Sequence, residues 1–204
     1  MTMGQNDLDD MATVSRRDLL MLLVGLGPSE SLNEGLGGIT RLQKYLFLLE
    51  NEEQVRPSGA GFEFVAYKAG PYSSKLYDDI EVLENLGLLE SEVTADASFI
   101  EAAEVDELTF DQLLDEASPT GEEVAGPEAF EERRFRLSTE GEKHVRLLLA
   151  KEDVGALADS IRRVKSRYAG YSLSDLLYHV YTKYDDWTTE SEIREKVLRK
   201  GRHR

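Results

Sequence analysis

The segment Ile39–Glu50 constrains the fold more than any other, because as a helix it is apolar around nearly its whole circumference. The residues that line one side at helical spacing, with three more that widen this face, are Ile39, Leu42, Leu46, Leu49, Tyr45, Phe47 and Leu48. A helix with so wide an apolar surface has to be covered on most sides by other elements. The sequence therefore predicts a domain with this helix at its centre.

Three more helices are predicted before and after it from apolar spacing and capping residues. One covers residues 15–26, with Ser15 and Asp18 as its N-cap pair. Another begins at Ser73 or Ser74 and ends at Gly87, and a further helix follows the Ser138-Thr139 cap. The Gly-rich residues 35–38 are interpreted as a connector.

Two extended segments that are far apart in the sequence predict a β wing. Leu88-Leu89-Glu90 is the natural pairing partner of Arg134–Leu137, in which apolar and basic residues alternate. A short strand is also expected within residues 62–67, where Gly70-Pro71 would end it. Residues 14–150 are thus predicted to form a winged-helix-like core with a small antiparallel β wing, in a mainly α (α+β) chain.

An acidic insertion occupies residues 90–132, with 15 acidic residues and neither lysine nor arginine. Segments of this composition rarely pack by themselves. We interpret it as an elongated, solvated wing tip. The alternative is an acidic surface that mimics nucleic acid or docks on a basic partner.

The two ends of the chain differ from the core in composition. Residues 1–13 are polar and predicted to be disordered, whereas residues 151–204 contain 12 basic and nine acidic residues. The latter have apolar residues at helical spacing, and Ser172 with Asp175 forms a cap. They are predicted to form a C-terminal helical appendage with a basic tail.

The overall composition excludes several classes of protein. The 204 residues include no cysteine, which excludes disulfides and thiol chemistry and agrees with a cytoplasmic location. The net charge of -16 repels nucleic acid and anionic membranes on average, and we hypothesise that it reflects adaptation to high salt (a halophilic cell). No apolar run is long enough to span a membrane.

Residues Ser15-Arg16-Arg17, followed by apolar residues, are similar to a twin-arginine export signal. The apolar run stops at Gly27-Pro28, however, and no cleavage site follows. A buried amphipathic helix is the favoured interpretation.

Catalytic chemistry is not indicated. The three histidines, His144, His179 and His203, have no metal-ligand spacing. The glycines of residues 35–38 lack the lysine and hydroxyl residue of a phosphate loop, and no nucleophile elbow is present. The sequence predicts a protein that is not an enzyme, with no catalytic residues, no cofactor and no metal.

Four segments, residues 40–49, 67–73, 83–89 and 135–141, resemble the YwgA-like proteins and the SocA-type antitoxin domain in order and character. The most specific elements are Gln43-Lys44 and Gly70-Pro71-Tyr72-Ser73, and the last segment is similar to the wing and final helix of PadR-type regulators. The resemblance covers about residues 15–150. It implies a winged-helix-like fold and a regulatory or adaptor role, and it supplies no catalytic residues. The acidic insertion departs from this pattern and argues against contact between the wing and a DNA groove.

Two hypotheses follow for the partner. The first is a regulatory or antitoxin-like module that binds a protein through the third helix and the preceding turn; its candidate contact residues are Lys68, Pro71, Tyr72, Lys75 and Tyr77. The second is a transcription regulator that binds DNA as a homodimer joined by the helices after residue 151, with candidate contacts at Arg162, Arg163, Lys165 and Arg167. Acidic residues outnumber basic ones in the third helix, which favours a protein partner over transcription regulation through DNA.

Overall fold

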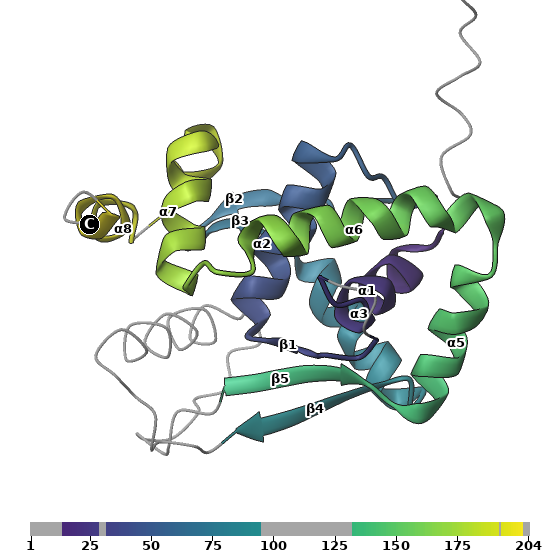
Figure 1. Ribbon diagram of the computed structural model, residues 1–204. Coiled ribbons are helices and arrows are strands. Elements are labelled where there is room, and N and C mark those ends of the chain that lie inside the picture. Colours follow the sequence, from purple (N-terminus) through teal and green to yellow (C-terminus); the bar gives the residue numbers. More distant parts are fainter. Residues whose placement is uncertain (1–13, 29–31, 95–131, 192, 202–204) are drawn as a thin grey trace, which may run out of the picture.

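Helix α2, Ile39–Glu52, lies at the centre of the structure, a computed structural model that describes residues 14–28, 32–94, 132–191 and 193–201 (Figure 1). Every side chain from Leu42 to Glu50 is buried, as its apolar circumference predicts. The helix ends two residues later than expected. The predicted disorder of residues 1–13 and most of the acidic insertion, residues 95–131, fall outside the described residues.

The other helices predicted within the core are confirmed as α1, Arg16–Gly25, α3, Ser74–Asn85, and α5, Thr139–Leu149. Ser15 caps α1, because its Oγ accepts a hydrogen bond from the backbone N–H of Asp18 at 3.1 Å. Ser138 caps α5 in the same way, by accepting from the backbone N–H of Gly141 at 3.0 Å, whereas Ser73 makes no side-chain cap at the start of α3.

An antiparallel sheet has the strand order β1-β5-β4, with β1 at Leu36–Gly37, β5 at Glu132–Leu137 and β4 at Leu89–Thr94. Leu89 pairs with Leu137, so the predicted wing pairing is confirmed. Two expectations were wrong. The supposed connector contains β1, which pairs with β5, and residues 90–94 belong to strand β4 and not to the insertion.

A second sheet is a hairpin of β2, Val65–Tyr67, and β3, Gly70–Tyr72. The predicted strand was too long at its start, and Gly70-Pro71 begins a strand where a break was expected. Gly70 has a φ of +81°, a conformation that glycine adopts without strain, and this allows the two-residue turn at Lys68-Ala69.

The chain after residue 150 forms α6, Gly155–Tyr168, α7, Leu173–Lys183, and α8, Arg194–Gly201, with short 3₁₀ turns η2, Glu152–Val154, and η3, Asp185–Thr188. In Figure 1, α6 crosses over α2, and both α6 and α7 contact α2. The expected appendage therefore shares one hydrophobic core with residues 14–150. The mainly α (α+β) class is confirmed. None of the helices in the described ranges is long and apolar enough to cross a bilayer.

Candidate functional site

The two most specific motifs of the family resemblance touch each other in the structure. Lys44 is 2% exposed, and its Nζ donates hydrogen bonds of 2.8 Å to the carbonyl oxygens of Ala69 and Pro71. Beside it, the backbone N–H of Ser73 donates to Gln43 Oε1 at 3.0 Å. The two acceptors of Lys44 lie in the hairpin and the donor to Gln43 lies at the start of α3, so Gln43 and Lys44 fix both elements on α2.

The five candidate partner-binding residues differ from one another in burial and in contacts. Tyr72 and Tyr77 are half-buried at the surface of the hairpin and of α3, and Lys68 is half-buried in the hairpin turn. Lys75 forms an ion pair with Glu63. Pro71 is buried and its carbonyl is bonded to Lys44, so its assignment as a contact residue was wrong.

A row of three tyrosines, which we call the tyrosine row, joins the hairpin to α3. The ring centroids of Tyr67 and Tyr72 are 5.0 Å apart, and those of Tyr72 and Tyr77 are 5.8 Å apart. Val65, which is 53% exposed, pairs with Tyr72 across the hairpin and lies on the same face of β2 as Tyr67. The three half-buried rings therefore lie next to one another, with the exposed Val65 beside them.

The exposed charged residues of α3, next to this row, are acidic. Its exposed residues are Ser74, Asp78, Glu81 and Asn85. The one lysine of the helix, Lys75, is paired with Glu63. A helix with this surface presents no cation to a phosphate backbone.

The four candidate nucleic-acid contacts all lie on α6. Arg162, Arg163 and Arg167 surround one shallow hollow, but each forms an ion pair, with Asp159 at 3.3 Å, Glu53 at 2.8 Å and Glu52 at 2.5 Å respectively. Lys165 is 5% exposed and donates to the carbonyl oxygen of Leu26. Its assignment as a nucleic-acid contact was wrong, because its ammonium group is directed into the protein. Burial lowers the pKa of Lys165 to about 8, against a small opposing effect of Glu34.

Glu52, near the end of α2, is the centre of a polar network that holds the C-terminal helices. Its carboxylate accepts hydrogen bonds from Lys183 at 2.6 Å, Tyr168 at 2.8 Å and Arg167 at 2.5 Å. Burial opposes ionisation of this side chain, but the hydrogen bonds outweigh it and lower the pKa of Glu52 to about 2. The network is an anchor between α2, α6 and α7.

A second buried carboxylate, Asp79 of α3, binds both arginines of the pair that is similar to an export signal. Arg16 and Arg17 each form an ion pair with Asp79, which is completely buried. The hydrogen bond to Asp79 raises the pKa of Arg16. Both arginines therefore join α1 to α3 in the folded chain.

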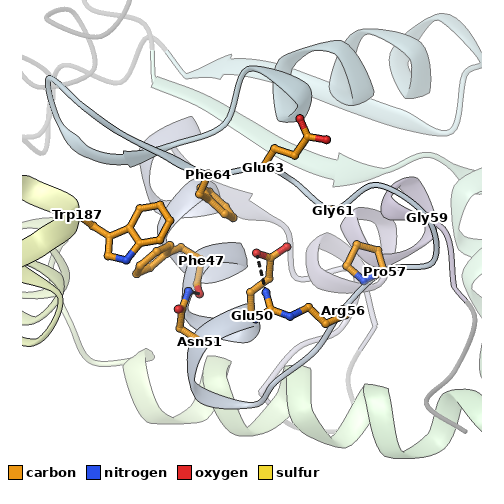
Figure 2. A pocket seen from close by; sticks show the side chains of 10 residues that line it. All are labelled: Phe47, Glu50, Asn51, Arg56, Pro57, Gly59, Gly61, Glu63, Phe64 and Trp187. Atoms are coloured by element: carbon orange, nitrogen blue, oxygen red, sulfur yellow. Dashed lines mark hydrogen bonds and ion pairs between the residues drawn. The ribbon is translucent and has the colours of Figure 1, made fainter. Parts of the chain in front are cut away.

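A cavity of about 390 Å³ opens beside Glu50 of α2, and Figure 2 shows the side chains around it. Phe47, Phe64 and Trp187 gather on one side of Glu50, and Arg56 lies on another side. The Glu50 carboxylate is 9% exposed and Arg56 Nη1 lies 3.4 Å from it. Burial raises the pKa of Glu50, while the N–H of Phe62 and the charge of Arg56 act in the opposite direction.

Sequence reasoning did not find Glu52, Asp79 or this cavity. Glu52 and Lys183 are 131 residues apart, and Arg16 and Asp79 are 63 apart, so no local spacing links them. The signal that was available is the position of Glu50 directly after the apolar run Tyr45–Leu49. Within the described ranges, no group of three histidine, aspartate or glutamate side chains is placed to hold a metal ion.

In comparisons with known proteins, no protein-family model matches the chain, and no curated protein matches its sequence.

Proposed function

We propose that the chain is a cytoplasmic, non-enzymatic regulatory or adaptor module that binds a protein partner through the tyrosine row. The observation that carries this proposal is the run of tilted ring contacts between Tyr67, Tyr72 and Tyr77 across the hairpin and α3 at half-buried positions. Tyrosine offers a large, rigid contact area with a polar end, and it is enriched where proteins bind each other. Partner binding of the antitoxin kind is consistent with this surface.

The charges near the row support a protein partner over DNA. The exposed positions of α3 are neutral or acidic. In DNA-binding winged-helix proteins, the third helix is the one that enters the major groove. The arginines of α6 are already paired with carboxylates. Binding of DNA there would have to break these pairs and would bring phosphates close to Asp159, Glu52 and Glu53.

Affinity capture from the source cells tests the proposal, with the wild-type chain and two tyrosine variants as baits. Tyr77→Ala shortens the tyrosine row, whereas Tyr171→Ala removes a tyrosine that is 38% exposed and packs on Tyr168 outside the row. We expect a protein that is retained by the wild type and by Tyr171→Ala but lost with Tyr77→Ala. Thermal unfolding confirms that both variants are folded.

Retention of the same proteins by Tyr77→Ala would overturn the proposal. Recovery of DNA that Tyr77→Ala leaves unchanged, and that Arg162→Ala with Arg163→Ala and Arg167→Ala abolishes, would establish the DNA-binding hypothesis instead. A second copy of the chain as the protein retained would identify the row as a homodimer interface.

A further inference from the structure

The carboxylate of Glu50 is buried at the cavity without a strong partner. Its nearest donors are the backbone N–H of Phe62 at 3.5 Å and Arg56 Nη1 at 3.4 Å, both at the outer limit of hydrogen bonding. A buried carboxylate in this state is poorly compensated for the water that it has lost. It would gain from a cation that approached to normal distance, particularly one that donates two hydrogen bonds.

The rest of the cavity suits an organic cation and not a bare metal ion. Phe47 packs edge-on against Phe64 and Trp187, at centroid distances of 5.5 Å and 5.3 Å, and these rings form an aromatic wall beside Glu50 (Figure 2). Aromatic rings attract organic cations and also cover their apolar parts. The volume of about 390 Å³ is within the range of small-ligand pockets.

Space next to the carboxylate is kept free by Gly61. A Cβ atom at this position would lie 3.5 Å from Glu50 Oε1, so any longer side chain would grow into the region that a ligand needs. Glu63 also lines the cavity, but its carboxylate points away from Glu50 in Figure 2 and is paired with Lys75. Glu50 is therefore the acidic group that faces the cavity.

The contact with Arg56 shows that this carboxylate can pair with a guanidinium group. Its guanidinium group approaches Glu50, yet the side chain is 64% exposed. An ion pair of this length whose cation is mostly exposed contributes little to stability. A competing cation can therefore displace Arg56 at small cost.

We propose that the cavity beside Glu50 is a binding site for a guanidinium, amidinium or ammonium group on an apolar or aromatic ligand, with Glu50 as its anion and Arg56 as a weak internal competitor. The source of the group is either a free organic cation or an arginine side chain of a peptide. The site shares no residue with the tyrosine row, so a test of this site is independent of the test of the proposed function.

Titration of the full chain with benzamidine, followed by the indole N–H resonance of Trp187, tests this site. Trp187 is the only tryptophan of the chain, so its signal is unambiguous. We expect saturable binding of benzamidine and none of benzamide, its neutral analogue. Nα-acetyl-arginine methylamide is titrated in parallel, and the tighter of the two cations identifies the source.

Three variants complete the experiment. Glu50→Gln keeps an acceptor for Phe62 but removes the charge, and we expect at least about tenfold weaker binding. Arg56→Gln removes the competitor and should strengthen binding about threefold. Glu63→Gln is the matched control, with the same loss of charge at the same cavity, and should leave the affinity within about twofold. Thermal unfolding shows whether each variant is folded.

The proposal is overturned if neither cation saturates the wild type below about 10 mM. It is also overturned if benzamide binds as tightly as benzamidine, or if Glu50→Gln binds benzamidine as the wild type does.

Discussion

Lys44, Glu52 and Asp79 are charged residues whose side chains are almost completely shielded from water, and each is compensated by specific partners. Lys44 binds two carbonyl oxygens, Glu52 binds Lys183, Tyr168 and Arg167, and Asp79 binds two arginines. Buried charges are costly without such partners. In this protein they connect elements that are distant in the sequence, so their main effect is to fix how helices and hairpin are placed.

Replacement of Lys44 by methionine is expected to destabilise the fold by about 2 kcal/mol or more, because the carbonyl oxygens of Ala69 and Pro71 lose their buried donor. Urea unfolding measures the change. Lys143→Met is the matched control, since Lys143 is 62% exposed and pairs with Glu140 on the same helix. Its effect should stay within about 0.5 kcal/mol. Equal effects for the two variants would contradict a structural role for Lys44.

Ionisation of Glu52 should make the free energy of unfolding depend on pH. Its pKa falls from an ordinary value of 4.5 to about 2 on folding, so its stabilising effect is complete above pH 4.5 and is lost as the pH falls toward 2. We expect Glu52→Gln to be less stable than the wild type by about 2 kcal/mol at pH 7, allowing for solvent screening of the half-exposed partners. The difference should disappear near pH 2. A difference that is constant from pH 7 to pH 2 would show that the charge of Glu52 is not responsible.

Single residues were predictable from the sequence where a local feature marks them, and not where burial decides their role. Tyr72 and Tyr77 were proposed as partner contacts, and both are half-buried, so part of each side chain is accessible. Lys165 was proposed for the surface as one of a run of basic residues, but it lies opposite Leu26, which is 139 residues earlier. No pattern within α6 could show that contact.

The helices were predicted well because their signals are local. Ser172 and Asp175, for example, form the expected capping box at the start of α7. The short strands β1 and β3 were missed because two or three residues carry no periodicity. Leu36 becomes a strand residue only through Phe135, its partner in β5. The cavity beside Glu50 was equally inaccessible, since its walls come from α2, the loop before β2 and η3.

The start of α5 gives a prediction about packing between elements. A Cβ atom on Gly141 would lie 2.0 Å from the carbonyl oxygen of Leu88, which also accepts a hydrogen bond from the N–H of Ser138. Gly141→Ala is therefore expected to cost about 2 to 3 kcal/mol, measured by urea unfolding. Gly155→Ala is the control, because nothing lies within 4 Å of the added atom at the start of α6. It should be neutral or stabilising by about 0.5 kcal/mol. A neutral Gly141→Ala variant would show that α5 can move away from Leu88.

The whole molecule carries a net charge of -16, and most of the described basic side chains discussed above are used in internal ion pairs. Such an excess of one sign is self-repulsive in dilute buffer and is screened by salt. We expect the Tm to rise between about 0.1 M and about 3 M KCl. Thermal unfolding at both concentrations checks this. An unchanged Tm would contradict adaptation to high salt.

Two features of the molecular surface bear on the kind of partner. The exposed charges of α3, beside the tyrosine row, are acidic, and the arginines of α6 are paired with carboxylates. Both features favour a protein partner. The most direct measurement is photo-crosslinking in the source cells, with benzoylphenylalanine in place of Tyr77, or in place of Leu147, which is 70% exposed on α5. We predict a discrete protein adduct at position 77 and none at position 147. Absence of a protein adduct at position 77, or the same adducts at both positions, would contradict binding of a partner through the tyrosine row.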